Sequence, residues 1–318
     1  MKKYLLFCLF CLCISTGYAQ NTYPNRTIKI VLPVSAGGGT DIVTRIIAQQ
    51  LSKVLGESVI VDNKPGAGGN LAAEQVAHAK PDGYTLLVVT PNHATNANLY
   101  KKMGYDPIKD FIPISQLTSQ PYLFVINNNV PAKTIKEFIA FAQSNKNTSY
   151  ASSGKGLLGH LGMEQLKMAG NFDATHIPYK GASPALIDTS SGQVQAFLPT
   201  IVSGLPFAKQ GQVRLIAVTS PNRLASLPNV PTIAESGFPG YEVLGWYGLL
   251  APAGTPKPII TKLYEAVKQV LNNPEVREKI SADGADPVGS TPEQFEEFLG
   301  KERIRWAKII KASGIESD

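Results

Sequence analysis

The chain has 318 residues, of which 43% are hydrophobic and 17% charged, and its formal net charge is +6. This length provides for two domains of ordinary size, each able to bury a hydrophobic core. Lys and Arg are scattered without a basic tract, so nucleic-acid binding has little support, whereas the modest positive charge favours an anionic ligand.

The first nineteen residues have the pattern of an export signal. Lys2 and Lys3 give a positive start, residues 4–14 form a nearly unbroken apolar core, and residues 17–19 (Gly-Tyr-Ala) place small side chains at the positions that determine cleavage. The apolar stretch is shorter than the roughly 20 residues of a membrane-spanning helix. We therefore expect cleavage near Ala19, which would also remove all three cysteines and any thiol chemistry.

The first part of the remaining chain alternates strand and helix. Hydrophobic periodicity predicts strands over residues 27–32, 58–62 and 84–90 and helices over residues 41–55 and 71–79. Apolar strands that alternate with amphipathic helices imply a mostly parallel sheet covered by helices on both faces. In such sheets ligands bind beyond the carboxyl ends of the strands.

Two glycine-rich loops lie at that edge. The first glycine loop, residues 35–40 (Ser-Ala-Gly-Gly-Gly-Thr), follows the first strand, and the second glycine loop, residues 65–70 (Pro-Gly-Ala-Gly-Gly-Asn), follows the second. Glycine lets the backbone approach a bound group, and Thr40 or Asp41 is placed to cap the next helix, whose first N–H groups can meet an anion. Leu71 occupies the third glycine position of a dinucleotide fingerprint and no Walker A sequence occurs, so we assign no cofactor.

A second alternation of strands and helices follows. Loops rich in Gly and Ser again lead from strand to helix: the serine loop, residues 152–156 (Ser-Ser-Gly-Lys-Gly), and the tyrosine loop, residues 179–183 (Tyr-Lys-Gly-Ala-Ser). The second unit therefore repeats the device of the first. Its periodicity predicts strands near residues 122–126, 149–151, 174–178, 195–198 and 213–219 and helices over residues 134–143, 158–169, 184–189 and 201–210.

The rest of the chain returns to the first unit. Residues 241–251 form an apolar and aromatic strand, and three further helices, each with proline in its first turn, are predicted over residues 258–271, 274–281 and 292–311. Crossings near residues 118–124 and 238–250 would join two lobes into a hinged clamp. We expect lobe 1 to comprise residues 20–120 and 240–318, and lobe 2 to comprise residues 121–239.

Motifs along nearly the whole mature chain have the order and spacing of one known family. They are residues 33–41, residues 61–69, residues 82–87, Ser152-Ser153-Gly154, Pro178-Tyr179-Lys180-Gly181, Val230-Pro231-Thr232, Ala251-Pro252 and Trp306. Together they resemble the extracytoplasmic solute receptors of tripartite tricarboxylate transporters, often called Bug receptors. The resemblance implies an α/β two-lobed periplasmic binding protein fold (type II), in which each lobe is a mostly parallel sheet flanked by helices and the hinge has two crossings.

The resemblance also implies a function. A receptor of this kind captures a small organic carboxylate in the periplasm, largely through backbone N–H groups and hydroxyls, and delivers it to membrane transporter subunits. Members bind different acids, so the family does not name the ligand. Leu157 stands where Ser or Thr is common in the family, which makes that wall more apolar and argues against a small, very polar acid such as citrate.

The residues that we expect to contact the ligand come from the strand-to-helix loops of both lobes and from the returning strand: Ser35, Ala36, Gly37, Gly38, Gly39, Thr40, Asp41, Gly69, Asn92, His93, Ser152, Ser153, Gly154, Tyr179, Lys180, Gly181, Thr200 and Trp246. Structural roles remain the alternative for many of them. Turn geometry alone is the alternative for the glycines, and helix capping for Asp41 and the two serines. Lys180 has the alternative of a solvated surface charge, and Trp246 that of core packing.

Two other classes of function are compatible with the sequence. An exported input domain of a carboxylate-sensing two-component system would have the same features. A secreted hydrolase has less support because the Gly-x-Ser-x-Gly nucleophile elbow is missing, although paired acids for glycoside cleavage meet only in the fold. The four histidines are dispersed without metal-ligand spacing, so we expect neither a metal site nor enzyme activity.

Overall fold

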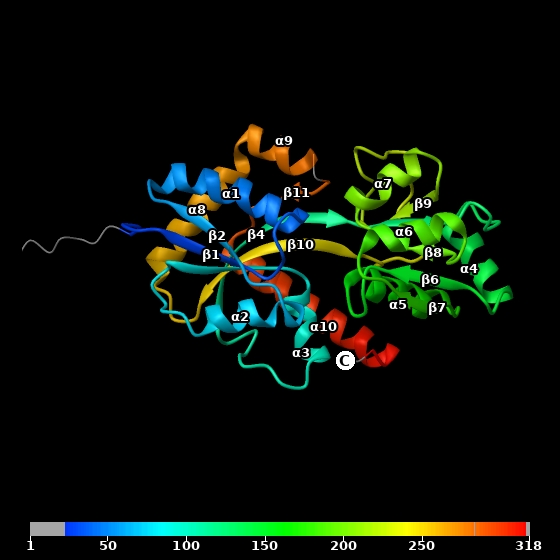
Figure 1. Cartoon of the computed structure of the whole chain (residues 1–318), viewed down its shortest axis with the longest axis horizontal. Helices are drawn as coiled ribbons and strands as arrows, with labels where there is room; N and C mark the ends of the chain where they lie inside the picture. Colours follow the sequence, from blue (N-terminus) through cyan, green and yellow to red (C-terminus); the bar gives the residue numbers. More distant parts are fainter. Residues whose placement is uncertain (1–22, 283, 316–318) are drawn as a thin grey trace, which may run out of the picture.

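The computed structural model describes residues 23–282 and 284–315, so the predicted export signal lies outside the described residues. These residues form two lobes that lie side by side, each with one β-sheet and flanking helices (Figure 1). Lobe 1 is on the left of Figure 1 and lobe 2 on the right. The two-lobed α/β architecture predicted from the sequence is confirmed.

Lobe 1 contains a six-stranded sheet with the strand order β11-β4-β10-β3-β1-β2. The strands are β1 (Ile28–Leu32), β2 (Val59–Asn63), β3 (Thr85–Val89), β4 (Phe111–Pro121), β10 (Leu244–Pro252) and β11 (Asp286–Pro287). The helices of this lobe are α1 (Gly39–Leu55), the 3-10 turn η1 (Ala67–Gly69), α2 (Asn70–Ala77), α3 (Asn92–Leu99), α8 (Lys257–Asn272), α9 (Pro274–Ala282) and the long α10 (Pro292–Ser313).

Lobe 2 contains a five-stranded sheet with the order β7-β6-β8-β5-β9. Its strands are β5 (Leu123–Ile126), β6 (Ser149–Ser152), β7 (Thr175–Pro178), β8 (Ala196–Phe197) and β9 (Arg214–Val218). The helices that cover this sheet are α4 (Ile135–Ser144), α5 (Leu158–Gly170), α6 (Ala182–Ser191) and α7 (Ile201–Lys209). In both lobes the loops after parallel strands lead directly into helices, as the sequence predicted.

The prediction that each sheet is mostly parallel is wrong, because both sheets are mixed. In lobe 1, β10 runs antiparallel to both β3 and β4, and in lobe 2, β5 runs antiparallel to β8 and β9. The strands that break the parallel order adjoin the crossings between the lobes: β4 leads directly into β5, and β10 brings the chain back. Apolar runs reveal a strand but not its direction.

The sequence predicted neither strand β4, whose end was expected only as a crossing between the lobes, nor helix α3. The residues of α3 are mostly polar, so no apolar stripe marks it. Instead, its buried Asn96 donates from Nδ2 to Oδ1 of Asn70 (2.7 Å) and to the carbonyl oxygen of Gly68 (3.0 Å), while the Tyr105 hydroxyl also donates to Asn70 (2.8 Å). This buried network satisfies its polar groups and attaches α3 to the second glycine loop.

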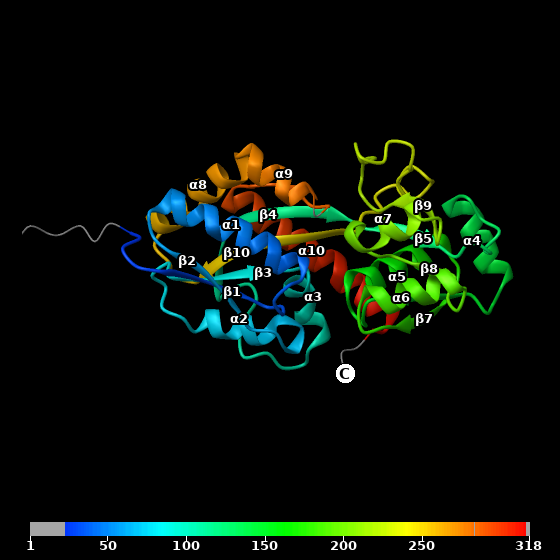
Figure 2. The same cartoon turned by 45° about the horizontal axis from the view of Figure 1, so that its top comes forward.

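Helix α10 belongs to both lobes. Its first half packs Phe295 and Leu299 into a core of lobe 1 that also contains Trp246, whereas Trp306 and Ile309 lie in the main core of lobe 2. Figure 2 shows the helix running from the lobe 1 sheet towards α5. The sequence left open which lobe this helix packs on, and the structure adds it as a third link beside the two crossings.

Candidate ligand-binding site between the lobes

A cavity of about 280 Å³ lies between the two lobes. Lobe 1 contributes the start of α1, Gln120 of β4 and Tyr247 of β10, and lobe 2 contributes the start of α7. The residues that line this interlobe cavity are Gly39, Thr40, Val43, Gln120, Thr200, Val202, Ser203, Tyr247 and Ala285. Helices α1 and α7 therefore both begin at the cavity, and the first N–H groups of a helix have no partner within the helix.

The polar side chains of the cavity are hydroxyls and an amide. Gln120 donates from Nε2 to the Tyr247 hydroxyl at 3.1 Å, and the Thr200 and Ser203 hydroxyl oxygens lie 2.6 Å apart. A Cβ atom on Gly39 would lie 3.7 Å from the Tyr247 hydroxyl oxygen, so this tyrosine faces the first glycine loop. Hydroxyls, an amide and helix N-termini form a neutral set of groups that suits a carboxylate.

The first glycine loop is held from within by Asp41. Residues 35–39 are exposed, while the Asp41 carboxylate is buried and accepts hydrogen bonds from Gly37 N–H (3.0 Å), Arg45 Nε (3.0 Å) and Asn63 Nδ2 (2.9 Å). The Arg45 hydrogen bond is the main reason that the pKa of Asp41 falls to about 2. The carboxylate is thus ionised and is directed at the loop and at Arg45.

The prediction that Thr40 or Asp41 caps α1 is wrong. The helix begins at Gly39, so the capping position falls on Gly38, which has no side chain to cap with. The helix thus begins two residues earlier than the polar residues suggest, and the Asp41 side chain, now in the first turn, accepts from Gly37 N–H just before the helix. Thr40 instead lines the interlobe cavity.

The second glycine loop lies beside α3. The Gly68 carbonyl oxygen accepts from Asn92 Nδ2 at 3.4 Å, and a Cβ on Gly69 would lie 3.0 Å from Cβ of Pro33 in lobe 1. A space of only about 10 Å³ lies under this loop, bounded by Gly69 and His93 among others. This space is too small for an organic acid.

His93 lies within lobe 1. Its ring contacts Phe111 edge to face, with 5.2 Å between ring centroids, and Nε2 lies 3.1 Å from the Pro107 carbonyl oxygen. Burial lowers the pKa of His93 to about 4, so the ring is neutral near pH 7. These contacts give His93 a packing role behind the loop, and neither His93 nor Asn92 is among the residues that line the interlobe cavity.

The serine loop of lobe 2 faces lobe 1. A Cβ on Gly156 would lie 3.1 Å from Cδ1 of Leu99, at the end of α3. Ser153 and Gly154 are half-buried, whereas Ser152 is buried and its hydroxyl accepts from Gly154 N–H at 3.2 Å. The loop that was predicted to meet the ligand from lobe 2 therefore lies at the boundary between the lobes.

The tyrosine loop is attached to the serine loop. Gly181 N–H donates to the Ser153 carbonyl oxygen (3.1 Å), and Tyr179 N–H donates to that of Ser152 (3.0 Å). The Tyr179 hydroxyl donates to Asp188 at 2.6 Å, while Lys180 is exposed. Burial, with help from this hydrogen bond, raises the pKa of Tyr179 to about 12, so it remains a neutral hydroxyl.

Trp246 does not lie in the cavity. Its side chain is fully buried, its indole N–H donates to Glu302 at 3.1 Å, and it packs against Phe295 and Phe298 of α10. Core packing is therefore its role, and the expectation of a ligand wall is wrong for this residue. Successive strand side chains point to opposite faces, so Tyr247 faces the cavity instead.

Three polar residues of the cavity were missed in the sequence: Gln120, Ser203 and Tyr247. Gln120 and Tyr247 lie on the paired strands β4 and β10 that cross between the lobes. The alternation of side chains along β10 was a usable signal for Tyr247. If Trp246 faces the core, Tyr247, which has a polar hydroxyl, must point to the opposite face of the sheet. Ser203 carries no such signal, because a single serine in a helix is common.

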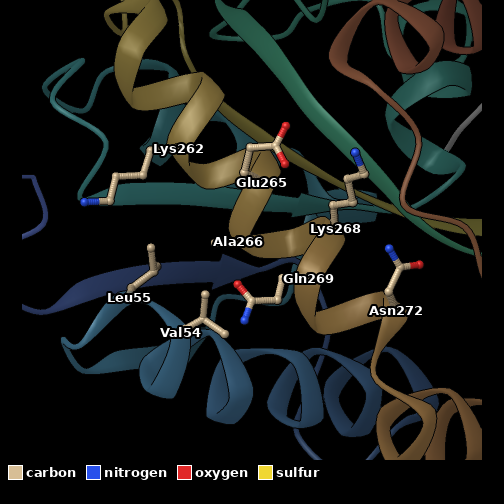
Figure 3. A pocket seen from close by; sticks show the side chains of 8 residues that line it. All are labelled: Val54, Leu55, Lys262, Glu265, Ala266, Lys268, Gln269 and Asn272. Atoms are coloured by element: carbon tan, nitrogen blue, oxygen red, sulfur yellow. The ribbon is translucent and has the colours of Figure 1, made fainter.

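Two other hollows are less suited than the interlobe cavity to binding a ligand between the lobes. One of about 370 Å³ lies between α1 and α8 (Figure 3), and its lining includes Val54 and Leu55 of α1 and Lys262, Glu265 and Lys268 of α8. All its lining residues belong to lobe 1, so closure of the lobes would not enclose a ligand there. A larger hollow of about 720 Å³ adjoins the interlobe cavity but contains none of the predicted ligand residues.

Within residues 23–282 and 284–315, no group of three or more His, Cys, Asp or Glu side chains could hold a metal ion. The same described residues include no helix with the length and apolar character required to cross a membrane.

Comparison with known proteins identifies the family. Residues 43–315 match the tripartite tricarboxylate transporter family receptor. BugT of Bordetella pertussis is 32% identical over 304 residues, which cover 95% of this chain and 93% of BugT. The structure of R. palustris Rpa4515 with adipate is 36% identical with a TM-score of 0.80, covering 93% of this chain and 100% of that chain.

The structure of MatC (Rpa3494) from Rhodopseudomonas palustris with bound malate is 35% identical, with a TM-score of 0.76 over 91% of this chain and 100% of that chain. These matches extend over both lobes and therefore over the interlobe cavity. The chain belongs to the receptor family of tripartite tricarboxylate transporters, and the receptors of this family are solute-binding proteins and not enzymes.

Proposed function

We propose that this chain binds a small organic carboxylate in the interlobe cavity, in the periplasm after export, and hands it to membrane subunits of a tripartite transporter. The observation that carries the proposal is that α1 of lobe 1 and α7 of lobe 2 both begin at one cavity. Adipate and malate, which accompany two similar structures, are both small dicarboxylates.

The chemistry of the lining supports an acid that must later be released. No Lys, Arg, Asp or Glu is among the described residues that line the cavity. The positive ends of two helices attract an anion, while the absence of a bidentate arginine keeps the complex easy to reopen. Affinity for the closed form that exceeds affinity for the open form would drive closure.

We assign the contacts as follows. Gly37 to Thr40 would approach the ligand from lobe 1, with Gln120 and Tyr247 as side-chain partners. The serine loop, the tyrosine loop and Thr200 would approach it from lobe 2. We retain residues 20–120 and 240–318 as lobe 1 and residues 121–239 as lobe 2, with the second half of α10 packed on lobe 2.

A thermal-shift and calorimetry screen against adipate, malate and a panel of other small acids tests this function. A ligand that binds only the native form raises the melting temperature. We expect at least one of these acids to bind, and a panel without any effect would contradict the proposal. Loss of growth on that acid after gene deletion would then support transport and argue against a sensing role.

Gly38→Phe is the sharpest single variant for the site. Gly38 has φ −83° and ψ 166°, which any residue can adopt, and a Cβ there would meet no atom within 4 Å. We therefore expect an intact fold but an affinity at least about tenfold weaker, roughly 1.4 kcal/mol. The matched control is Gly300→Phe on α10, where the nearest atom to a new Cβ is 4.0 Å away. Unchanged affinity in Gly38→Phe would refute the assignment of the first glycine loop.

A further inference from the structure

Two histidines lie stacked behind the serine loop and are unused by the proposed capture of the ligand. His160, in the first turn of α5, and His176 of β7 have ring centroids 3.6 Å apart and ring planes within 11° of parallel. Tyr150 of β6 stacks beside His176 at 5.1 Å. His160 is buried and His176 is half-buried, so the pair forms the floor beneath the loop.

Each histidine makes a hydrogen bond to one end of the serine loop. Gly156 N–H donates to Nδ1 of His160 at 3.0 Å, and Nε2 of His176 lies 2.7 Å from the Ser152 hydroxyl oxygen. Since a backbone N–H can only donate, Nδ1 of His160 carries no proton. The bond to Gly156 therefore requires the neutral ring, with its proton on Nε2.

The surroundings keep the rings neutral. Burial is the main reason that the pKa of His160 falls to about 3 and that of His176 to about 4, and the nearby charges of Lys167 and Lys155 act in the same direction. The carboxylate of Glu164, one turn after His160 on α5, accepts from the Tyr150 hydroxyl (2.5 Å) and from Lys167 Nζ (2.9 Å).

Lys167 is also 3.3 Å from Asp173, so both of these carboxylates are already paired with other groups. Stacking two rings at 3.6 Å further disfavours a charge on both, because like charges repel at this distance.

We propose that His160 and His176 are positioning residues for the ligand: as an uncharged stacked pair they hold the serine loop in the conformation that faces lobe 1. This inference rests on the proposed function. Gly156 donates its N–H to His160 and also lies against Leu99 of lobe 1. A change in the histidine pair would therefore move the loop where the two lobes meet.

Pairs of variants separate hydrogen bonding from packing. In His160→Asn, Oδ1 can take the place of Nδ1, whereas His160→Leu keeps an apolar side chain without an acceptor. His176→Gln and His176→Leu make the same comparison for Nε2. The affinities for adipate and malate are measured by calorimetry, with the exposed His78→Leu as a control for an unrelated histidine.

We expect both leucine variants to weaken binding at least about tenfold, and the Asn and Gln variants to stay within about threefold of the wild type. A role in packing alone predicts the opposite order, because leucine preserves apolar contacts and buries no amide. Equal affinity of His160→Leu and the wild type would overturn the inference, as would losses in His160→Asn as large as those in His160→Leu.

A second readout needs no ligand. The nitrogen-15 chemical shift of His160 Nδ1 should be that of an unprotonated nitrogen at pH 7, and hydrogen exchange of the Gly156 amide should accelerate in His160→Leu but not in His160→Asn. A protonated Nδ1 would overturn the inference even if the leucine variant failed to fold. If the wild type bound no acid of the panel while these shifts were as expected, the proposed function would fail, and the positioning of a ligand with it.

Discussion

The first glycine loop and the serine loop are each attached to the helix that follows by a hydrogen bond from a glycine N–H, but the side chain that accepts this bond is charged in one loop and neutral in the other. In lobe 1, Gly37 N–H donates to the Asp41 carboxylate at 3.0 Å; in lobe 2, Gly156 N–H donates to the His160 imidazole at 3.0 Å. Both glycines have positive φ, 89° and 77°, and both acceptors lie four residues later in the first turn of the following helix. Each lobe thus pins its loop to its helix by one hydrogen bond.

The difference between the acceptors matters for an anion. Asp41 is ionised, but Arg45 and Asn63 bind its oxygen atoms and its side chain is buried. His160 places no charge beneath the serine loop. Because like charges repel more strongly where water is excluded, a carboxylate ligand meets less repulsion at the serine loop. The comparison suggests that lobe 2 is the lobe that tolerates the negative end of the ligand best.

Removing the acceptor in lobe 1 should have the largest effect. Asp41→Ala removes the buried carboxylate that accepts from Gly37 N–H, Arg45 and Asn63. Because Arg45 itself is half exposed, we expect the free energy of unfolding to fall by about 2–3 kcal/mol, the range for hydrogen bonds to a charged group. Urea denaturation measures this loss. Asp62→Ala is the control, since Asp62 forms longer ion pairs with the partly exposed Lys29 (3.6 Å) and Lys64 (3.5 Å), worth about 0–1 kcal/mol. Similar losses in both variants would contradict the pinning role of Asp41.

Acid should affect the two loops in different pH ranges. The lowered pKa values of His160 and His176, about 3 and 4, mean that the unfolded chain binds protons that the folded chain does not. Their contribution to stability is complete above pH 6.5 and is lost as the pH falls towards 4. The contribution of Asp41, whose pKa is lowered to about 2, is complete above pH 3.8 and is lost only as the pH falls towards 2.

Urea denaturation at pH 7, 5.5 and 4.5 tests this order. Between pH 7 and pH 4.5 the free energy of unfolding should fall by about 2 kcal/mol less in the double variant His160→Asn/His176→Gln than in the wild type. This figure is reduced because His176 is partly exposed and solvent weakens its electrostatic interactions. His93 is present in both proteins, so its own lowered pKa cancels in the difference. Parallel pH profiles of the two proteins would show that the stacked pair is not the acid-sensitive element.

The two pinned glycines should differ modestly when a methyl group is added. Positive φ costs alanine about 1 kcal/mol at either position. At Gly37 the new Cβ meets no atom within 4 Å, whereas at Gly156 it lies 3.1 Å from Leu99, which must shift. We expect Gly156→Ala to have the lower melting temperature. Gly300→Ala in α10 provides the control, and it should be neutral or slightly stabilising. A lower melting temperature for Gly37→Ala would reverse the comparison.

Much of the local structure followed from the sequence. The alternation of apolar runs and amphipathic segments located most strands and most helices within a few residues, although it missed β4 and β11. The glycine-rich and serine-rich segments were found where strands lead into helices. Helix α3 was missed because Asn96 and Asn70 replace an apolar stripe by a buried hydrogen-bond network. Periodicity detects the burial of apolar side chains and is blind to buried polar pairs.

The candidate site could be predicted only in part. Gly39, Thr40 and Thr200 do line one cavity between the lobes, whereas Trp246 packs in the core and its neighbour Tyr247 lines the cavity. Which of two consecutive residues faces a cavity depends on the register of a strand. That register is set by pairing with a strand far away in the chain, here β4.

Taken alone, the order of residues specified the α/β class, the family and the loops that could approach an anion, because these depend on local periodicity, glycine and motif spacing. The mixed strand directions, the α10 link and the stacking of His160 on His176 depended on contacts between segments distant in the chain. The two rings belong to a helix and a strand whose relative placement follows from packing around the whole lobe 2 core, and no local pattern encodes such an arrangement.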